Sequence, residues 1–218
     1  HPKQTKKKSE KKETKGADFH FATNLLAKEL EEAAGLGARI AESTNLVRTL
    51  ADTPSNFLKP NHYRDLVKAR AKENGYKFEF LDIKALEKLG AGSFLSVTKG
   101  DPEDLGGIIH LSYTPRGSKK RVALVGKGVC FDSGGYNIKT GNYMHGMHRD
   151  MTGSAVALSL FELLVATKAP FEVHCFMGLA ENLISPHASR PNDLFFAANG
   201  TSIEMVNTDA EGRLILAD

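Results

Sequence analysis

Acidic and basic side chains concentrate in two short glycine-bearing segments of the second half of the chain, VGKGVCFDSGGYNIK (125–139) and NTDAEGR (207–213). A third segment, HRDMTGSA (148–155), adds Asp150. Carboxylates at this density would repel one another if the fold brought them together, because each buried charge needs an opposing partner or a cation. The sequence therefore favours a fold in which turn-forming segments meet around bound divalent metal.

The spacing of these residues is compatible with oxygen ligands to one or two ions. Asp209 and Glu211 are separated by one residue, so in an extended loop their side chains point the same way and can grip one ion or bridge two. Asp132 precedes Gly134 and Gly135, where glycine permits backbone conformations and close approaches closed to other residues. None of the eight histidines lies in these two loops. Oxygen-dominated ligation suits Mg²⁺, Mn²⁺ or Zn²⁺.

Two lysines beside the carboxylates allow different roles. An ammonium group next to a dication and withdrawn from water loses its proton more readily, so Lys127 could bind metal as a neutral amine. A charged Lys139 aimed at a carbonyl oxygen would stabilise the negative charge that develops during attack by a metal-bound water. This chemistry is typical of a hydrolase.

These segments resemble the leucine aminopeptidase (cytosol aminopeptidase) family of two-metal exopeptidases, peptidase family M17. The resemblance rests on NTDAEGRL (207–214), on the pattern KGxxFDSGGxxxK that begins at Lys127, and on MHRDM (147–151). It extends from about residue 40 to the last residue, with LADTPSNFLKP and GSFLSVTKG included. It implies an α/β fold with a mixed sheet flanked by helices, like the phosphorylase/hydrolase-like catalytic domain of the family.

The resemblance also implies roles for individual residues. Two divalent ions, Zn²⁺ or Mn²⁺ and otherwise Mg²⁺, would be held by five ligands, with Asp132 and Glu211 bridging both. A water that bridges the ions would attack the first peptide carbonyl. Lys139 and Arg213 would be catalytic, with a bicarbonate on Arg213 to shuttle the proton, and Met147 would line the pocket for the first side chain. The five implied ligands are Lys127, Asp132, Asp150, Asp209 and Glu211.

The implied function is metal-dependent removal of the N-terminal residue, leucine or another apolar residue preferred, from peptide substrates. The resemblance suggests a homohexamer in the cytosol or an organelle. A different class of protein, a non-catalytic structural or binding protein that retains the aminopeptidase fold, is the alternative. A Mg²⁺-dependent phosphohydrolase would also use clustered carboxylates, but the sequence has no phosphate-cradling GxxxxGK loop.

The chain departs from the family pattern in two ways. Thr152 stands where a glycine is common, which predicts a more crowded start of the helix beside Asp150. The chain also stops at LILAD (214–218), in the first turns of an apolar helix and without a stop signal. We therefore expect a partial catalytic domain, incomplete at its C-terminus and without most of the amino-terminal domain of the family.

Composition adds a basic tail to this picture. Residues 1–16 carry seven lysines and two glutamates and lack apolar side chains apart from proline, which predicts a disordered, solvated tail or linker, with contact to nucleic acid or anionic lipid as the less favoured alternative. Hydrophobic residues make up 41% of the chain, enough for a real core, and no run of eighteen apolar residues predicts a membrane span. The predicted organisation is a disordered tail (1–16), a helical linker region (17–52) and a partial metallopeptidase domain (53–218).

Helices and strands alternate after residue 52, as expected for a sheet covered on both faces. The turn PRGS (115–118) joins two predicted strands, and the second leads directly into the FDSGG loop. The pair Asn199-Gly200 predicts a hairpin within residues 194–205. Helices are predicted at residues 61–74, 82–90 and 153–168, and strands at residues 76–82, 107–113, 121–126 and 171–180.

Two regions leave a choice open. Residues 19–52 predict one or two helices with an apolar face, interrupted near Gly35 and Gly37. Glu181 and Asn182 follow an apolar strand, and they are either polar residues of the site or residues that hold a loop in place.

Overall fold

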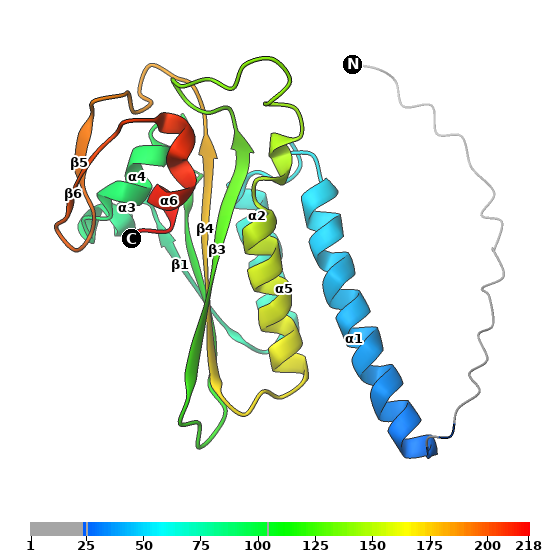
Figure 1. Cartoon of the computed structure of the whole chain (residues 1–218). Helices are drawn as coiled ribbons and strands as arrows, with labels where there is room; N and C mark the ends of the chain where they lie inside the picture. The colour runs from blue at the N-terminus through cyan, green and yellow to red at the C-terminus, as the bar shows by residue number, and fades with distance from the viewer. Residues whose placement is uncertain (1–23, 25, 104) are drawn as a thin grey trace.

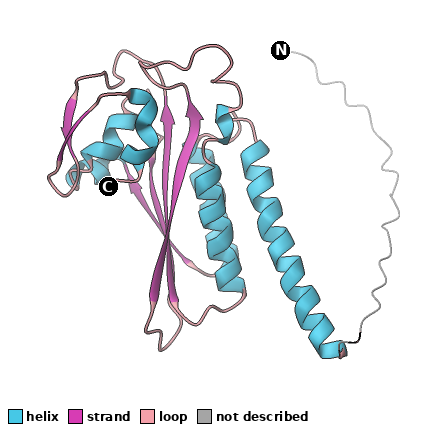
Figure 2. Ribbon diagram, viewed as in Figure 1, coloured by secondary structure: helices cyan, strands magenta, loops and turns pink. Residues whose placement is uncertain are grey.

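The computed structural model describes residue 24, residues 26–103 and residues 105–218, so the tail predicted at 1–16 lies outside the described residues. The described chain contains both helices and strands, interspersed along the sequence (Figures 1 and 2). The helices are α1 (Ala27–Asp52), α2 (Pro60–Asn74), α3 (Ile83–Lys88), α4 (Gly92–Thr98), α5 (Thr152–Ala166) and α6 (Glu211–Ile215), with short 3-10 helices η1 (Met147–Arg149) and η2 (Thr208–Ala210). The strands are β1 (Lys77–Asp82), β2 (Gly107–Tyr113), β3 (Arg121–Asp132), β4 (Glu172–Asn182), β5 (Leu194–Phe196) and β6 (Ser202–Glu204).

The main sheet has four strands in the order β1-β2-β4-β3. Strand β2 is antiparallel to β1 and β4, whereas β3 runs parallel to β4, so the sheet is mixed as predicted. The turn at residues 115–118 connects β2 to β3, but these two strands do not pair because β4 lies between them. Strand β4 carries the apolar run 171–180. Because β4 lies between β2 and β3, its backbone N–H and C=O groups find hydrogen-bond partners on both sides.

Helices cover both faces of the sheet, which confirms the predicted layering. Figure 1 shows α1, α2 and α5 on one side of the strands and α3, α4 and α6 on the other. The first face buries Tyr63, Val67, Leu158, Phe161, Ile109, Leu111, Cys175 and Met177. The second face buries Leu86, Phe94, Val97, Val129, Ala180, Leu214 and Ile215. Each large apolar side chain that is fully buried contributes about 1.5–3 kcal/mol relative to exposure.

Helix α1 runs from Ala27 to Asp52 without a break, so the interruption predicted near Gly35 and Gly37 is wrong. A glycine inside a helix costs about 1 kcal/mol relative to alanine, which lowers helix stability but does not end a helix. The second half of α1 also packs on α5, where the Ser43 and Ser159 hydroxyl oxygens lie 2.6 Å apart. This tertiary contact and the buried Leu50 stabilise the second half of the helix.

Two other elements differ from the sequence prediction. Helix α4 is not among the predicted helices, because its sequence, GSFLSVT, has low helix propensity. Burial of Phe94 and Val97 against the second face stabilises it. Strand β3 extends to Asp132, six residues beyond the predicted end at Gly126. Its extra residues, with the buried Val129 and Cys130, pair with the end of β4. The strand therefore carries Lys127 and Asp132 directly. The hairpin across Asn199-Gly200 is confirmed by the antiparallel pairing of β5 and β6.

We expect the Gly126→Ala substitution to reduce the free energy of unfolding by about 1–3 kcal/mol. A Cβ atom at this position of β3 would lie 2.5 Å from Ser154 Cα and 2.8 Å from Gly153 O, so α5 would have to shift away from the sheet. Gly37→Ala in α1 is the matched control, because a Cβ there meets no atom within 4 Å. That control should stabilise the protein by up to about 1 kcal/mol. Denaturant unfolding measures both, and equal stabilities would contradict the close packing of α5 on β3.

Among the described residues, no helix combines the length and the apolar character needed to cross a membrane.

Candidate metal centre

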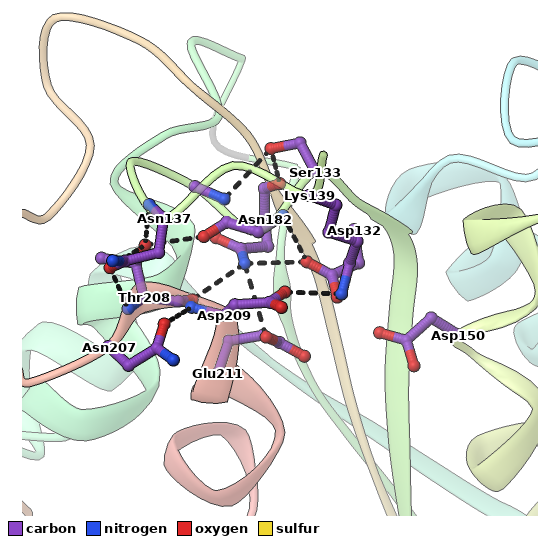
Figure 3. A network of polar contacts seen from close by, with 12 residues as sticks. Asp132, Ser133, Asn137, Lys139, Asp150, Asn182, Asn207, Thr208, Asp209 and Glu211 are labelled. Carbon is purple, nitrogen blue, oxygen red and sulfur yellow. Dashed lines mark hydrogen bonds and ion pairs between the residues drawn. The ribbon is translucent and has the colours of Figure 1, made fainter. Parts of the chain in front are cut away.

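The charged residues singled out above gather at the edge of the sheet where β3 and β4 end. These two strands are parallel, and Asp132 at the end of β3 is paired with Asn182 at the end of β4. The segment that carries η2 and α6 then lies beside this edge, so Asp209 and Glu211 join Asp132 (Figure 3). Ends of parallel strands commonly present functional loops, and this site follows that rule.

Three carboxylates form the centre of the site. One oxygen from each of Asp132, Asp209 and Glu211 lies within 4.8 Å of the other two. Asp132 and Glu211 are each 2% exposed, whereas the Asp209 side chain is 32% exposed. The extended-loop geometry expected for Asp209 and Glu211 is wrong, because Asp209 lies in η2 and Glu211 begins α6. The turn between them still brings both carboxylates to one point.

Two lysines are shared among four carboxylates. Lys127 Nζ lies 2.5 Å from Glu211 Oε1 and 2.7 Å from Asp150 Oδ2. Lys139 Nζ lies 2.5 Å from Asp209 Oδ1 and 2.9 Å from Asp132 Oδ2. Four ionised carboxylates against two ammonium groups leave two negative charges without an opposing charge. The remaining charge is what one or more divalent cations would neutralise.

The electrostatics of the lysines follow from these contacts. Burial lowers the pKa of Lys127, but hydrogen bonds and charge interactions with Asp150 and Glu211 outweigh it, and the net effect raises the pKa. Burial also lowers the pKa of Lys139, and its bonds to Asp209 and Asp132 likewise raise it overall. With carboxylates as partners both lysines are charged. A neutral Lys127 amine would require a cation that competes for the same oxygens.

Asp150 occupies a different position from the other carboxylates. Figure 3 shows it to one side of the three-carboxylate group, and it follows η1 directly. Burial raises its pKa to about 6, with Lys127 opposing the shift and Asp132 and Glu211 adding to it. Its buried Oδ2 lies 2.7 Å from Lys127 Nζ, and apart from this ion pair no described residue donates a hydrogen bond to it. A buried carboxylate oxygen whose close partner among the described residues is a cationic group fits a cation ligand.

A polar scaffold that the sequence reasoning missed locks the two loops together. Thr208 Oγ1 donates to Gly134 O at 2.6 Å and accepts from Asn137 N at 2.8 Å. Thr208 N donates to Asn137 Oδ1 at 2.9 Å. Gly134 and Gly135 have φ values of 87° and 65°, and a Cβ on Gly135 would lie 3.0 Å from Thr208 Oγ1. Glycine is therefore needed here, as predicted. The sequence feature that indicates this scaffold is the presence of Thr208 and Asn137 within the two charged motifs.

The remaining predicted residues lie on α6, on η1 and at the start of α5. Arg213 is exposed on α6 and has no ion-pair partner within residues 26–103 or 105–218. Met147 is half-buried at the start of η1. The Thr152 hydroxyl donates to Arg149 O at 2.5 Å, so this side chain ties the start of α5 to η1. The roles predicted for Arg213 and Met147 stay predictions.

Comparison with known sequences gives matches over most of the chain. Residues 45–218 match the family model of the cytosol aminopeptidase family, catalytic domain. A probable cytosol aminopeptidase of Sulfurihydrogenibium sp. is 39% identical over 211 residues, which cover 97% of this chain and 42% of the relative. A probable cytosol aminopeptidase of Nostoc punctiforme is 42% identical over 208 residues, covering 94% of this chain and 42% of the relative. The chain thus spans 42% of the length of either relative.

Solved structures give the same result. Leucyl aminopeptidase from Trypanosoma cruzi matches with a TM-score of 0.80 and 38% identity, over 83% of this chain and 35% of that one. Leucine aminopeptidase from Caenorhabditis elegans matches with a TM-score of 0.81 and 34% identity, over 88% of this chain and 38% of that one. The bottromycin maturation enzyme BotP in complex with Mn matches with a TM-score of 0.81 and 33% identity, over 86% of this chain and 41% of that one. The chain therefore belongs to the cytosol aminopeptidase family, peptidase family M17.

Proposed function

We propose that this protein acts as a metal-dependent aminopeptidase, which hydrolyses the bond after the N-terminal residue of a peptide. One observation carries the proposal. Asp132, Asp209 and Glu211 bring one oxygen each within 4.8 Å of one another, with Lys127 and Lys139 beside them, in a chain of the cytosol aminopeptidase family. The aminopeptidase names of the relatives agree with this activity.

The residues at the site fit two divalent ions. Asp132, Asp150, Asp209 and Glu211 supply carboxylate oxygens, and Lys127 would add an amine nitrogen. Zn²⁺ or Mn²⁺ is proposed, with Mg²⁺ a further option, and the Mn bound to BotP supports Mn²⁺. Bound ions would supply Lewis acidity at a carbonyl oxygen and lower the pKa of water. The buried Asp150 Oδ2, which pairs with Lys127 but accepts no further hydrogen bond from the described residues, and the excess negative charge are the features that such ions would satisfy.

The chain's own cationic residues would act on the substrate. Lys139 is charged, and its side chain is 14% exposed, so it can donate a hydrogen bond to an oxygen that gains negative charge with little competition from water. Arg213, two residues after Glu211, presents a planar guanidinium that can bind a small oxyanion such as bicarbonate through paired hydrogen bonds. Met147 would form part of the pocket for the first side chain and favour leucine or another apolar residue.

The proposal includes a homohexamer as the oligomeric state and the cytosol as the compartment. The second is supported by the name cytosol aminopeptidase that the relatives carry.

Hydrolysis of leucyl-amide tests the proposal directly. The protein should release leucine in the presence of Mn²⁺ or Zn²⁺, lose activity with a chelator, and regain it when Mn²⁺ is returned. N-acetyl-leucinamide is the matched control, because it lacks a free amino terminus and should not be cleaved. Activity that survives complete chelation would contradict the metal dependence. Tight metal binding without turnover would favour the non-catalytic alternative.

A further inference from the structure

Asn182 contacts both segments that carry the carboxylates (Figure 3). Its side-chain Nδ2 donates to Asp132 Oδ1 at 2.9 Å and to Thr208 O at 3.1 Å, and Glu211 Oε2 lies 3.5 Å away. One amide group at the end of β4 therefore connects the end of β3 to the segment that carries η2 and α6. Asp132 and Thr208 are far apart in sequence, and the amide is a direct link between them.

The orientation of this amide follows from its neighbours. A carboxylate and a backbone carbonyl accept hydrogen bonds and cannot donate them. If the amide were rotated by 180°, Oδ1 would face only acceptors, so the NH₂ group must point toward Asp132 and Thr208. The position thus requires a neutral donor. Aspartate has the same shape but would face two other carboxylates as a third negative charge.

Asn182 is buried at this position and is tied to Ser133. The residue is 5% exposed, and its backbone oxygen accepts from Ser133 N at 3.0 Å and from Ser133 Oγ at 2.7 Å. A cavity beside it has a volume of about 10 Å³, which is room for about one water molecule. The amide is therefore buried between the two loops, and its backbone is tied to the loop after β3.

The two carboxylate oxygens of Asp132 contact different groups. Oδ1 accepts from Asn182 Nδ2 and from Gly134 N, each at 2.9 Å. Oδ2 is thereby turned toward the cationic side, where Lys139 Nζ lies 2.9 Å away. Glu211 shows the same division, with Oε2 near Asn182 and Oε1 at 2.5 Å from Lys127 Nζ. In both carboxylates the oxygen that faces away from the amide lies against a lysine ammonium group.

We propose that Asn182 is a positioning residue, which orients the Asp132 and Glu211 carboxylates for metal binding. The inference rests on the proposed metal-dependent function. Hydrogen-bond partners of metal-binding carboxylates orient these ligands, and their loss typically costs roughly 10- to 100-fold in metal affinity. A residue that only closed the loop would affect folding stability without changing how a folded protein binds metal.

The test compares Mn²⁺ binding by the wild type and by Asn182→Leu, which keeps the side-chain shape and removes the donor. Calorimetric titration should show Mn²⁺ affinity reduced roughly 10- to 100-fold. The electron paramagnetic resonance spectrum of the saturated protein should also change, because the carboxylates reorient. Asn56→Leu is the matched control, because Asn56 is exposed and far from these contacts in sequence, and it should bind Mn²⁺ as the wild type does.

The outcomes separate the two proposals. A folded Asn182→Leu protein with wild-type Mn²⁺ affinity and spectrum, even at a lower melting temperature, overturns the role of Asn182 and leaves the proposed function standing. A wild type that binds no Mn²⁺ overturns both. If the leucine variant does not fold, Asn182→Ala removes the donor without adding apolar bulk beside Asp132. Its affinity should fall in the same direction, and wild-type affinity in the folded alanine variant overturns the inference.

Discussion

The Asp209→Asn variant is expected to lose tight binding of divalent metal and to hydrolyse leucyl-amide at least roughly 10³-fold more slowly, since metal catalysis supplies several kcal/mol. Asparagine keeps the shape of the side chain but removes one of the three negative charges that lie within 4.8 Å of one another. The Asp209 side chain is 32% exposed, so the variant should remain folded. Calorimetric titration with Mn²⁺ and steady-state kinetics measure the two effects.

Asp65→Asn provides the control, because Asp65 is an exposed residue of α2 whose ion pair is with its neighbour Arg64. It makes the same chemical change away from the site and should leave metal affinity and turnover unaltered. Wild-type activity of the Asp209→Asn variant would remove the central argument for the metal centre.

Lys139→Ala is expected to lower the turnover number for leucyl-amide by roughly 10²- to 10³-fold, the effect of losing one positioned electrostatic stabiliser. Metal affinity should be equal to that of the wild type or tighter. The reason is that the Lys139 ammonium lies 2.5 Å from Asp209 Oδ1 and 2.9 Å from Asp132 Oδ2, where it competes with a cation for both oxygens. Kinetics at saturating metal and a Mn²⁺ titration separate the two quantities.

An exposed lysine of α2, Lys72, gives the control variant Lys72→Ala, which should match the wild type in both measurements. Loss of metal binding together with turnover in Lys139→Ala would mean that Lys139 supports the site structurally. Unchanged turnover would rule out a catalytic role. The opposite effects of Asp209 and Lys139 on metal affinity therefore form the sharpest test of the proposed mechanism.

Much of the fold follows from local patterns. The apolar run at residues 171–180 and the helix-length apolar segment after Thr152 correspond to β4 and α5. Gly75 ends α2 in the left-handed conformation, and Asn199-Gly200 forms the hairpin. These sequence patterns depend on a few neighbouring residues, so the elements can be predicted without knowledge of the tertiary contacts.

Other features depend on contacts between distant residues. Helix α1 continues through Gly35 and Gly37 and packs against α5 in its second half, and burial of Phe94 stabilises α4. The sheet order places β4 between β2 and β3, although the turn between β2 and β3 indicates nothing about their separation. Propensity alone could not decide these cases because tertiary burial outweighs differences of about 1 kcal/mol.

The candidate site divides in the same way. The identities of its charged residues, the need for glycine beside Asp132 and the excess of carboxylates over lysines are properties of short motifs. Other features of the site cannot be predicted from short motifs. They are the positions of Asp209 in η2 and Glu211 in α6, the lysine that pairs with each carboxylate, and the contact of Asn182 with Asp132. These arise only when β3, β4 and α6 pack together, because motif spacing sets the direction of a side chain within one segment but not its distance from a segment 50 or more residues away.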